Sequence, residues 1–331
     1  MKHLLSAIAI TLAAVVPVKV MAECGTGEID FETTYPNAWK KAEAKSSATL
    51  NADGLLWKVS KPGIAPSYLF GTFHTEDVNA TPAGRAALEQ LHHQRMVFFE
   101  LGAGIKAEMQ AALVTDPYLI IAQEPAPLST WLSDTLAARL KAQTTALGLP
   151  AQALPAIKPG MLFAMISIPP CALRAAATRG APMDDQVRQV AEAAGITGIG
   201  LENWRDQLGL FIDKPLAEQR SLLSLGLAAN PDPEAAYSLT YRLYQQGRVQ
   251  MIWEISMAIA EALIPGDKVI STGVKLWKDL IVERNHAMAT RVTPALAEGG
   301  AMIVVGALHL PSKDGLVALI SKLGYTVERV K

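Results

Sequence analysis

The sequence predicts an α/β domain that is split by a long helical insertion. Runs of the β type alternate with stretches of helical periodicity at both ends of the chain. Residues from about 104 to 262 are instead rich in Ala and Leu at helical spacing and are repeatedly broken by proline. Half of the 331 residues are hydrophobic and 18% are charged, which is enough apolar material for a sizeable core.

A predicted hairpin opens the first half of the domain. The β-type runs 55–60 and 68–73 flank a Pro-Gly pair at 62–63, which favours a turn. A helix over 83–92 follows, because the Thr-Pro pair before it suits an N-cap and a first helical position. The apolar run 95–101 is too short for a helix and predicts a strand that is buried on both faces.

The insertion and the last segment complete the predicted order. Inside the insertion, helices over 184–194 and within 204–262, including a long one over 235–262, flank a short strand at 198–202. The last segment then repeats the first half in outline. Its predicted elements are a helix over 273–296, a strand over 301–305, a helix to 323 and a strand over 325–330.

The N-terminus has the pattern of a secretory signal peptide. Basic residues precede the apolar stretch 4–16, and Val20-Met21-Ala22 is a small-x-small pattern that signal peptidase cuts after Ala22. We therefore expect a periplasmic or secreted protein with no integral membrane segment after cleavage. Residues 23–53 are expected to form a tether with one helix near 38–46, and residues 54–331 form the α/β domain.

Cysteine content and charge limit the remaining possibilities. Cys24 and Cys171 are the only cysteines, so an oxidising compartment allows one bridge, and two unpaired thiols are the alternative. The net charge of −1 and the lack of a basic cluster argue against nucleic acid as a partner. The oligomeric state is not predicted.

Two identical Gly-x-x-His patterns follow predicted strands. They are Gly71-Thr72-Phe73-His74 and Gly306-Ala307-Leu308-His309, and Glu100 closes a third strand in the same topological position. Ligands gather at the carboxyl ends of strands in an open α/β sheet, where a glycine lets the chain turn sharply. Alone, each histidine would be an ordinary loop residue, and Glu100 an N-cap or a surface carboxylate. Together they predict a His/His/Glu set, which is typical of a catalytic divalent metal site.

Several of these segments resemble the ordered motifs of the TraB/GumN family, which is related to the Tiki metalloproteases. The resemblance extends from about Leu55 to Val330, and Ser312 stands where the family has a small glycine. The segments are Leu56-Trp57-Lys58-Val59, Tyr68-Leu69-Phe70-Gly71-Thr72-Phe73-His74, Phe99-Glu100-Leu101, Glu283-Arg284-Asn285 and Val304-Val305-Gly306-Ala307-Leu308-His309-Leu310.

The resemblance implies a Tiki-like, erythromycin-esterase-like fold, with a mixed sheet built from two similar halves. It implies a metal-dependent, peptidase-like hydrolase in which His74, Glu100 and His309 bind a divalent ion such as Mn, Co or Zn. Arg284 joins these three as a catalytic residue that binds a carboxylate or stabilises an oxyanion. The alternative is a non-catalytic protein that binds a peptide or small molecule and dampens extracellular signals.

Other residues have weaker support. Arg284 would otherwise be a solvated helix residue, Asp184 a helix-start acid and Glu202 a carboxylate at a strand exit. The chain lacks a Gly-x-Ser-x-Gly elbow and a His-Glu-x-x-His helix, so serine hydrolase and zincin mechanisms are disfavoured.

Overall fold

A six-stranded mixed sheet forms the centre of the protein in the computed structural model, which describes residues 24, 30–264 and 266–330. The strand order is β4-β3-β5-β2-β1-β6. The neighbours β4, β3, β5 and β2 run parallel, whereas β1 is antiparallel to both β2 and β6. The strands are β1 Leu56–Lys61, β2 Ile64–Thr72, β3 Met96–Leu101, β4 Thr197–Glu202, β5 Ala301–Gly306 and β6 Thr326–Arg329. The predicted α/β class and the opening hairpin are confirmed.

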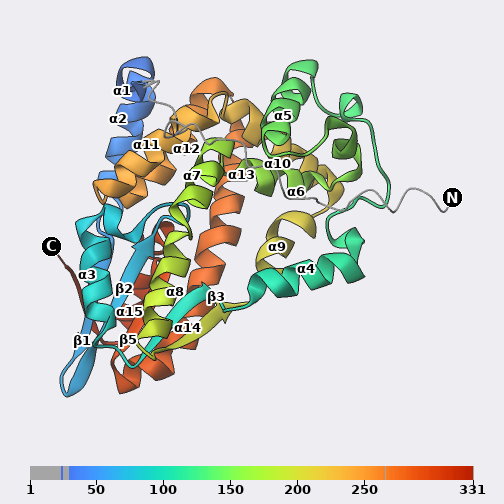
Figure 1. The fold of residues 1–331 in the computed structure, drawn as a ribbon. Coiled ribbons are helices and arrows are strands. Elements are labelled where there is room, and N and C mark those ends of the chain that lie inside the picture. Colours follow the sequence, from blue (N-terminus) through green and yellow to red (C-terminus); the bar gives the residue numbers. More distant parts are fainter. Residues whose placement is uncertain (1–23, 25–29, 265, 331) are drawn as a thin grey trace.

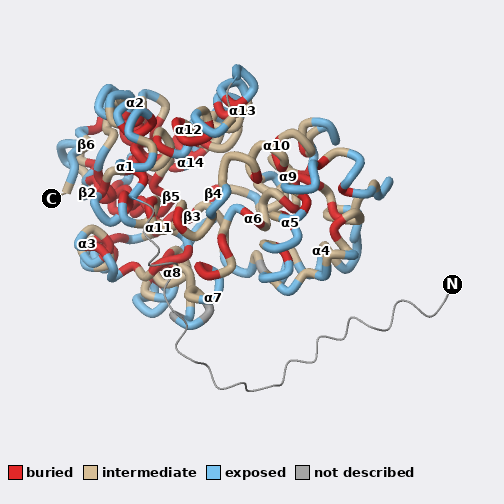
Figure 2. The backbone as a smooth tube through the Cα atoms, turned by 90° about the horizontal axis from the view of Figure 1, so that it is seen from above, coloured by how far each residue is buried: buried red, intermediate tan, exposed pale blue. Residues whose placement is uncertain are grey.

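Helices cover both faces of the sheet (Figure 1). In β5, Ile303 packs among residues of α14 and α15, whereas Val304 packs among residues of α3 and α8. The buried stretches accordingly concentrate around the strands and their covering helices (Figure 2). The bounds are α3 Pro82–Leu91, α8 Met183–Ala193, α14 Glu283–Glu298 and α15 Leu316–Lys322.

The predicted insertion is helical apart from β4, which joins the edge of the sheet next to β3. Helices α5, α6 and α10 form a separate apolar core around Leu140, Leu162 and Leu223, set apart from the sheet (Figure 1). The helices of this region are α4 Ile105–Thr115, α5 Asp134–Ala146, α6 Pro159–Ile166, α7 Pro170–Arg179, α9 Trp204–Ile212, α10 Leu216–Ala229, α11 Pro233–Gln245 and α12 Val249–Leu263.

Two predicted helices have different bounds in the structure. The long helix expected over 235–262 is two helices, α11 and α12, because Gly247 turns the chain between them with φ 70°. The helix expected from 273 begins earlier, at the start of α13 Asp267–Trp277, and passes through one π-helical turn, Lys278–Val282, into α14. Such π turns are frequent at functional sites.

The two helices that precede β1 pack on the domain. Helices α1 Phe31–Thr34 and α2 Pro36–Ser47 bury Phe31, Trp39 and Ala42 against α11 and α12. These two aromatic rings lie in one apolar core with α11 and α12, and the helix expected near 38–46 is α2. The predicted signal peptide, residues 1–22, lies outside the described residues.

The cysteines are paired. Cys24 and Cys171 form a disulfide with Cα atoms 5.2 Å apart, which joins the start of the described chain to α7. The carbonyl of Cys24 also accepts a hydrogen bond from Ser238 Oγ of α11, at 3.0 Å. Of the two alternatives that the sequence left open, the structure has the bridge.

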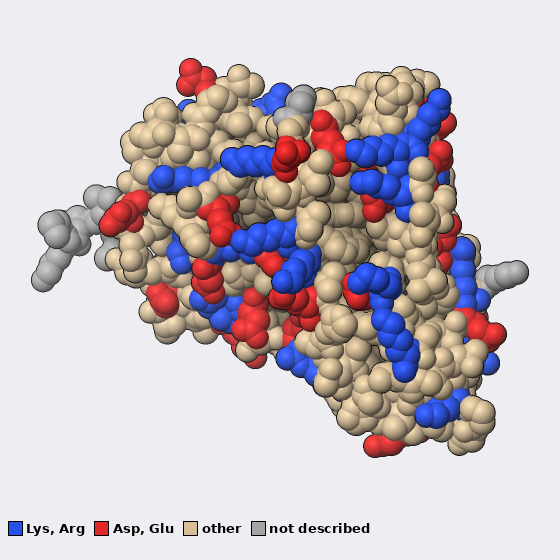
Figure 3. Space-filling model, turned by 180° about the vertical axis from the view of Figure 1, so that it is seen from behind, with Lys and Arg blue, Asp and Glu red and all other residues tan. Residues whose placement is uncertain are grey.

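The surface in Figure 3 carries acidic and basic side chains side by side. This mixture matches the net charge of −1. Within the described part of the chain, no single helix has the length and apolar character to cross a membrane. One bent pair, α6 with Pro170–Ala176, meets that criterion by length and composition alone.

Candidate functional site

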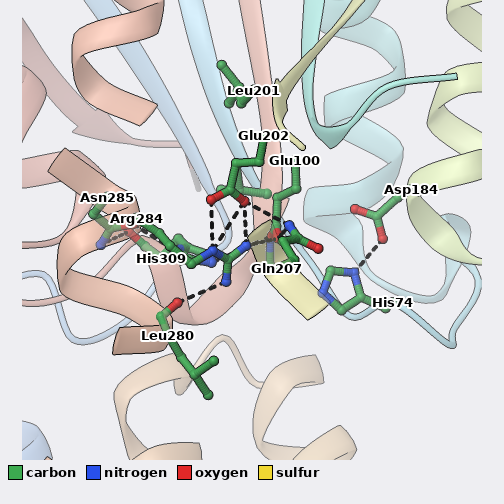
Figure 4. Close-up of polar contacts among 12 residues, drawn as sticks. His74, Glu100, Asp184, Leu201, Glu202, Gln207, Leu280, Arg284, Asn285 and His309 are labelled. Atoms are coloured by element: carbon green, nitrogen blue, oxygen red, sulfur yellow. Dashed lines mark hydrogen bonds and ion pairs between the residues drawn. The ribbon is translucent and has the colours of Figure 1, made fainter. Parts of the chain in front are cut away.

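The strand register brings the two histidine motifs and Glu100 to one edge of the sheet. Thr72 of β2 pairs with Gly306 of β5, and Phe99 of β3 pairs with Val304 of β5. Because these three strands are parallel, their carboxyl ends meet at one edge, and the residues that follow them converge there. Figure 4 shows His74, Glu100 and His309 close together. The structure therefore brings the predicted His/His/Glu set together.

The motif glycines allow close approach of neighbouring groups. Neither Gly71 nor Gly306 has a positive φ, so neither position needs the conformational freedom of glycine. A Cβ on Gly71 would lie 2.9 Å from the Ala307 Cα atom. A Cβ on Gly306 would lie 3.2 Å from both Glu100 Oε1 and His74 Nε2. These two atoms thus face the same small space, which Gly306 leaves open.

His74 is held by a carboxylate from α8. Its Nδ1 lies 2.7 Å from Asp184 Oδ2, and Asp184 Oδ1 accepts a hydrogen bond from Thr72 Oγ1 at 2.9 Å. The charge of Asp184 is the main cause that raises the pKa of His74 to about 9, and the partial loss of water around the ring works against this shift. The ring is therefore protonated at neutral pH, and its side chain is 57% exposed.

His309 is held by an amide from α14. Asn285 donates through Nδ2 to the carbonyls of His309 (3.3 Å) and Asp314 (2.9 Å), so its Oδ1 is the atom that faces His309 Nδ1, at 2.6 Å. Nδ1 therefore carries the proton, and Nε2 has a free lone pair 3.7 Å from Glu100 Oε1. Burial disfavours the charged ring and lowers the pKa of His309 to about 4.

Glu100 is an ionised carboxylate between the two imidazoles. Its Oε1 accepts the Gly306 N–H at 2.6 Å, and its Oε2 accepts a hydrogen bond from Arg284 Nη2 at 2.5 Å. Burial alone would raise the pKa of Glu100, but the imidazoles, the guanidinium and the backbone N–H hold it well below its usual range. Glu100 is consequently a weak proton acceptor and a strong source of negative potential.

Arg284 holds two carboxylates in place. Besides Glu100, its guanidinium binds Glu202, with Nε 2.9 Å from Oε1 and Nη2 2.6 Å from Oε2. Its Nη1 donates to the carbonyl of Leu280, in the π turn, at 2.9 Å. With these groups engaged, Arg284 orients Glu100 and has little capacity left to stabilise an oxyanion, which is one of the two roles expected from the sequence.

The donor atoms around Glu100 are not arranged to coordinate a metal ion. Among the residues that the structure describes, no group of three or more His, Cys, Asp or Glu side chains is arranged to hold one. Both oxygens of Glu100 are already hydrogen-bonded, one of them to a permanent cation. The cation of Arg284 opposes a second positive charge at the same carboxylate. The expected divalent ion therefore does not fit this arrangement, and metal binding by His74, Glu100 and His309 stays a prediction.

The site opens into a cavity of about 740 Å³. His74, Glu100, Arg284 and His309 line one part of it. Most of the remaining wall is apolar. The helical region contributes Ile168, Pro169, Leu210, Phe211, Pro233, Ala236 and Ile252, and the π turn contributes Leu280 and Ile281. A few convergent polar groups in a mostly apolar pocket are typical of a small-molecule or catalytic site.

Sequence reasoning missed part of the site. Thr72 and Gln207 were not singled out, although Gln207 Nε2 donates to Glu202 Oε2 at 2.8 Å and contacts Glu100 Oε2 at 3.4 Å. Asp184 and Glu202 had structural alternatives, and both lie in the site. The Glu-Arg-Asn motif was the one sequence signal for Asn285.

Among the comparisons with known proteins, only the family comparison finds a match. No curated protein and no solved structure matches this chain. The model of the TraB/PrgY/gumN family matches residues 55–329, which include both histidine motifs, Glu100 and Arg284. Because this match covers most of the sequence, the chain belongs to the TraB/PrgY/gumN family.

Proposed function

We propose that this protein is a hydrolase of amide or ester bonds in which two histidines have opposite proton roles. One observation carries the proposal. Each imidazole is held at Nδ1 by a side chain of another element, and each turns Nε2 toward the space beside Glu100. Paired titratable groups whose environments push their pKa values apart are the usual arrangement of a general acid and a general base.

His309 is the proposed base. Its neutral Nε2 accepts a proton from water as the water oxygen bonds to the substrate carbonyl carbon. The Glu100 carboxylate, 3.7 Å from Nε2, stabilises the imidazolium that forms. Asn285 keeps the ring in the tautomer that this step needs.

His74 is the proposed acid. Its charged ring first stabilises the negative charge that develops on the attacked carbonyl oxygen. When the carbon to leaving-group bond breaks, the Nε2 proton passes to the departing nitrogen or oxygen. His309 then returns its proton to solvent and His74 takes one up, which restores the starting state. Asp184 maintains the ring orientation throughout, as in other acid–histidine pairs.

The test is a product screen with matched variants. The purified protein is incubated with a random peptide library and a panel of nitrophenyl esters, and products are identified by mass spectrometry. We expect products with the wild type and with His286→Ala, because His286 is exposed and lies outside the site. His74→Ala and His309→Ala should form products at least about a hundredfold more slowly. Unchanged turnover in a folded double variant would refute the assignment.

Metal dependence is a separate part of the proposal. The resemblance implies Mn, Co or Zn at His74, Glu100 and His309, and no step above passes through an ion. Elemental analysis of the purified protein and the same screen with a chelator test this part directly. Activity that is lost on chelation and restored by one of these ions would establish the metal role that the side-chain arrangement does not favour.

The competing function is a non-catalytic protein that retains a peptide or small molecule in the same cavity. The screen separates the two, because a binding protein would hold a library member without releasing products. The polar centre favours catalysis, since a simple binding site does not require two imidazoles with opposite proton states.

Export and the finer fold assignment also belong to this proposal. The Cys24–Cys171 bridge supports a periplasmic or secreted location, because disulfides persist in oxidising compartments. A Tiki-like fold of two similar halves is supported by the order strand, Gly-x-x-His, helix, strand, which occurs around both β2 and β5. Cell fractionation tests the first point, and superposition on an experimental Tiki structure tests the second.

A further inference from the structure

A second cavity adjoins the catalytic cavity. A cavity of about 300 Å³ lies beside it. The two share five lining residues, which we call the waist: Ser167, Asn230, Ala236, Thr240 and Ser256. Since the same side chains border both spaces, the two cavities adjoin at the waist, and we call them the catalytic chamber and the distal chamber.

The distal chamber is apolar and nearly uncharged. Its wall includes Phe31, Tyr35, Phe163 and Leu263. Among the described residues that line it, Asp232 alone is charged, and its carboxylate caps α11 by accepting the Ala235 N–H at 3.0 Å. This chamber is suited to an apolar group, and its one carboxylate disfavours an anion.

The waist offers one polar side chain that is free to donate a hydrogen bond. The hydroxyls of Ser167, Thr240 and Ser256 donate to carbonyls of their own helices. The side-chain amide of Asn230 has no hydrogen-bond partner within residues 30–264 and 266–330. Asn230 can therefore both donate to and accept from a ligand that passes through the waist.

We propose that the distal chamber binds the apolar end of a neutral amide-containing substrate, and that Asn230 binds the amide group next to that end. This inference rests on the proposed hydrolase, for which it names the substrate class. Phe31 and Tyr35 lie outside residues 55–329, the part that the family model matches. The distal chamber is thus partly built by a segment outside the family match.

The test measures binding rather than turnover. N-acetyl-, N-butanoyl-, N-hexanoyl- and N-octanoyl-glycinamide are titrated calorimetrically into the wild type and into His74→Ala. We expect affinity to rise about fourfold for each added methylene group until the chamber is full, because each methylene leaves water for an apolar wall. Affinity that does not depend on chain length would overturn the proposal.

Two variants and one control locate the effect. Ala236→Trp places a large ring in the waist and should abolish the dependence on chain length, whereas Ala217→Trp, at an exposed position on α10, should preserve it. Asn230→Ala should weaken the whole series about fivefold without changing that dependence, since it removes one hydrogen bond. Chain-length dependence that survives in a folded Ala236→Trp would overturn the placement in the distal chamber.

Failure of the hydrolase proposal is distinguishable from failure of this one. Chain-length dependence in a protein that cleaves none of the screened substrates would support the distal chamber and count against the hydrolase alone. Cleavage of short substrates with no preference for apolar chains, in turnover or in binding, would overturn the distal chamber alone.

Discussion

His74 and His309 occupy equivalent places in the fold and have opposite proton states. Each follows a parallel strand at the third residue after a glycine, and the two strands are neighbours. His74 is largely exposed and bound to the Asp184 carboxylate, and its pKa is raised to about 9. His309 is buried and bound to the Asn285 amide, and its pKa is lowered to about 4.

The difference shows that the motif fixes where an imidazole lies, whereas a partner outside the motif fixes its charge. A carboxylate favours the imidazolium and outweighs the partial loss of water around His74. An amide oxygen is neutral and does not offset burial at His309. The two partners come from α8 and α14, so these helices give two identical motifs different chemical roles.

Removal of either imidazole ring is the most severe test of the two opposite proton roles. His74→Ala and His309→Ala should each lower kcat by about 10²- to 10⁴-fold, the usual contribution of a general acid or base. His74→Ala should change the unfolding free energy by no more than about 2 kcal/mol. His309→Ala should cost more, because it leaves a cavity and an unpaired Asn285 oxygen. Kinetics and thermal unfolding measure both effects, and equal turnover in the His286→Ala and His74→Ala variants would contradict the assignment.

The pH dependence of activity should have the shape that two opposite roles require. The active form has His309 neutral and His74 protonated, so kcat/KM should rise as pH increases through about 4 and fall as it increases through about 9. The acidic limb belongs to His309 and the alkaline limb to His74. A profile that rises continuously to pH 10 would assign the base role to His74 instead.

Exchanging the side chains that bind the two histidines should shift the acidic and alkaline limbs of the pH profile. Asp184→Asn removes the charge that raises the pKa of His74, which should fall from about 9 toward its ordinary value of 6.5. Asn285→Asp should raise the pKa of His309 from about 4, because a carboxylate replaces the amide. Proton NMR titration of the ring C–H signals measures both pKa values. Titration curves that match the wild type would show that the partners do not set the proton states.

Folding stability should depend on pH with opposite slopes for the two histidines. The pKa of His309 is lowered on folding, so the unfolded chain binds more protons between pH 6.5 and 4 and stability falls as pH decreases. The fall should reach about 3 kcal/mol for this buried ring. The pKa of His74 is raised, so its contribution is complete below about 6.5 and is lost as pH rises through about 9.

Denaturant unfolding of the glutamine variants separates these slopes. His309→Gln should flatten the acidic side of the stability curve, and His74→Gln should flatten the alkaline side. If both substitutions flatten the same side, the two rings share one proton state and the comparison fails.

The parts of this fold that depend on local pattern were predictable from the sequence. Alternation, apolar runs and the Pro-Gly turn located the strands, and the shared strand-end position of His74, Glu100 and His309 predicted their meeting. The parallel register then followed from the class of sheet. These features depend on short segments whose side-chain period is visible in one dimension.

The partners of the histidines depend on packing between distant segments. Asp184 lies 110 residues from His74, and its position depends on how α8 covers the sheet. Gln207 reaches Glu202 and Glu100 from α9, which no strand-end pattern indicates. The docking of α1 likewise depends on the apolar face of α12, which the sequence of α1 does not reveal.

A single methyl group in the space between Glu100 and His74 is the mildest test of the comparison. In Gly306→Ala the new Cβ would lie 3.2 Å from Glu100 Oε1 and from His74 Nε2, so both side chains must shift by a few tenths of an ångström. Turnover should fall roughly tenfold, because catalysis is sensitive to small displacements of reacting groups. Stability should change little, since the backbone at Gly306 has an ordinary φ of −54°.

Gly102→Ala is the matched control for this substitution. Gly102 also has no positive φ, and its added Cβ would meet the Gly200 Cα atom at an ordinary 3.8 Å. The control should keep wild-type turnover and a similar melting temperature. If both alanine variants turn over substrate equally well, the spacing between the Glu100 carboxylate and the His74 ring is not required. The acid role of His74 would then depend on Asp184 alone, and the shared space beside Glu100 would have no part in catalysis.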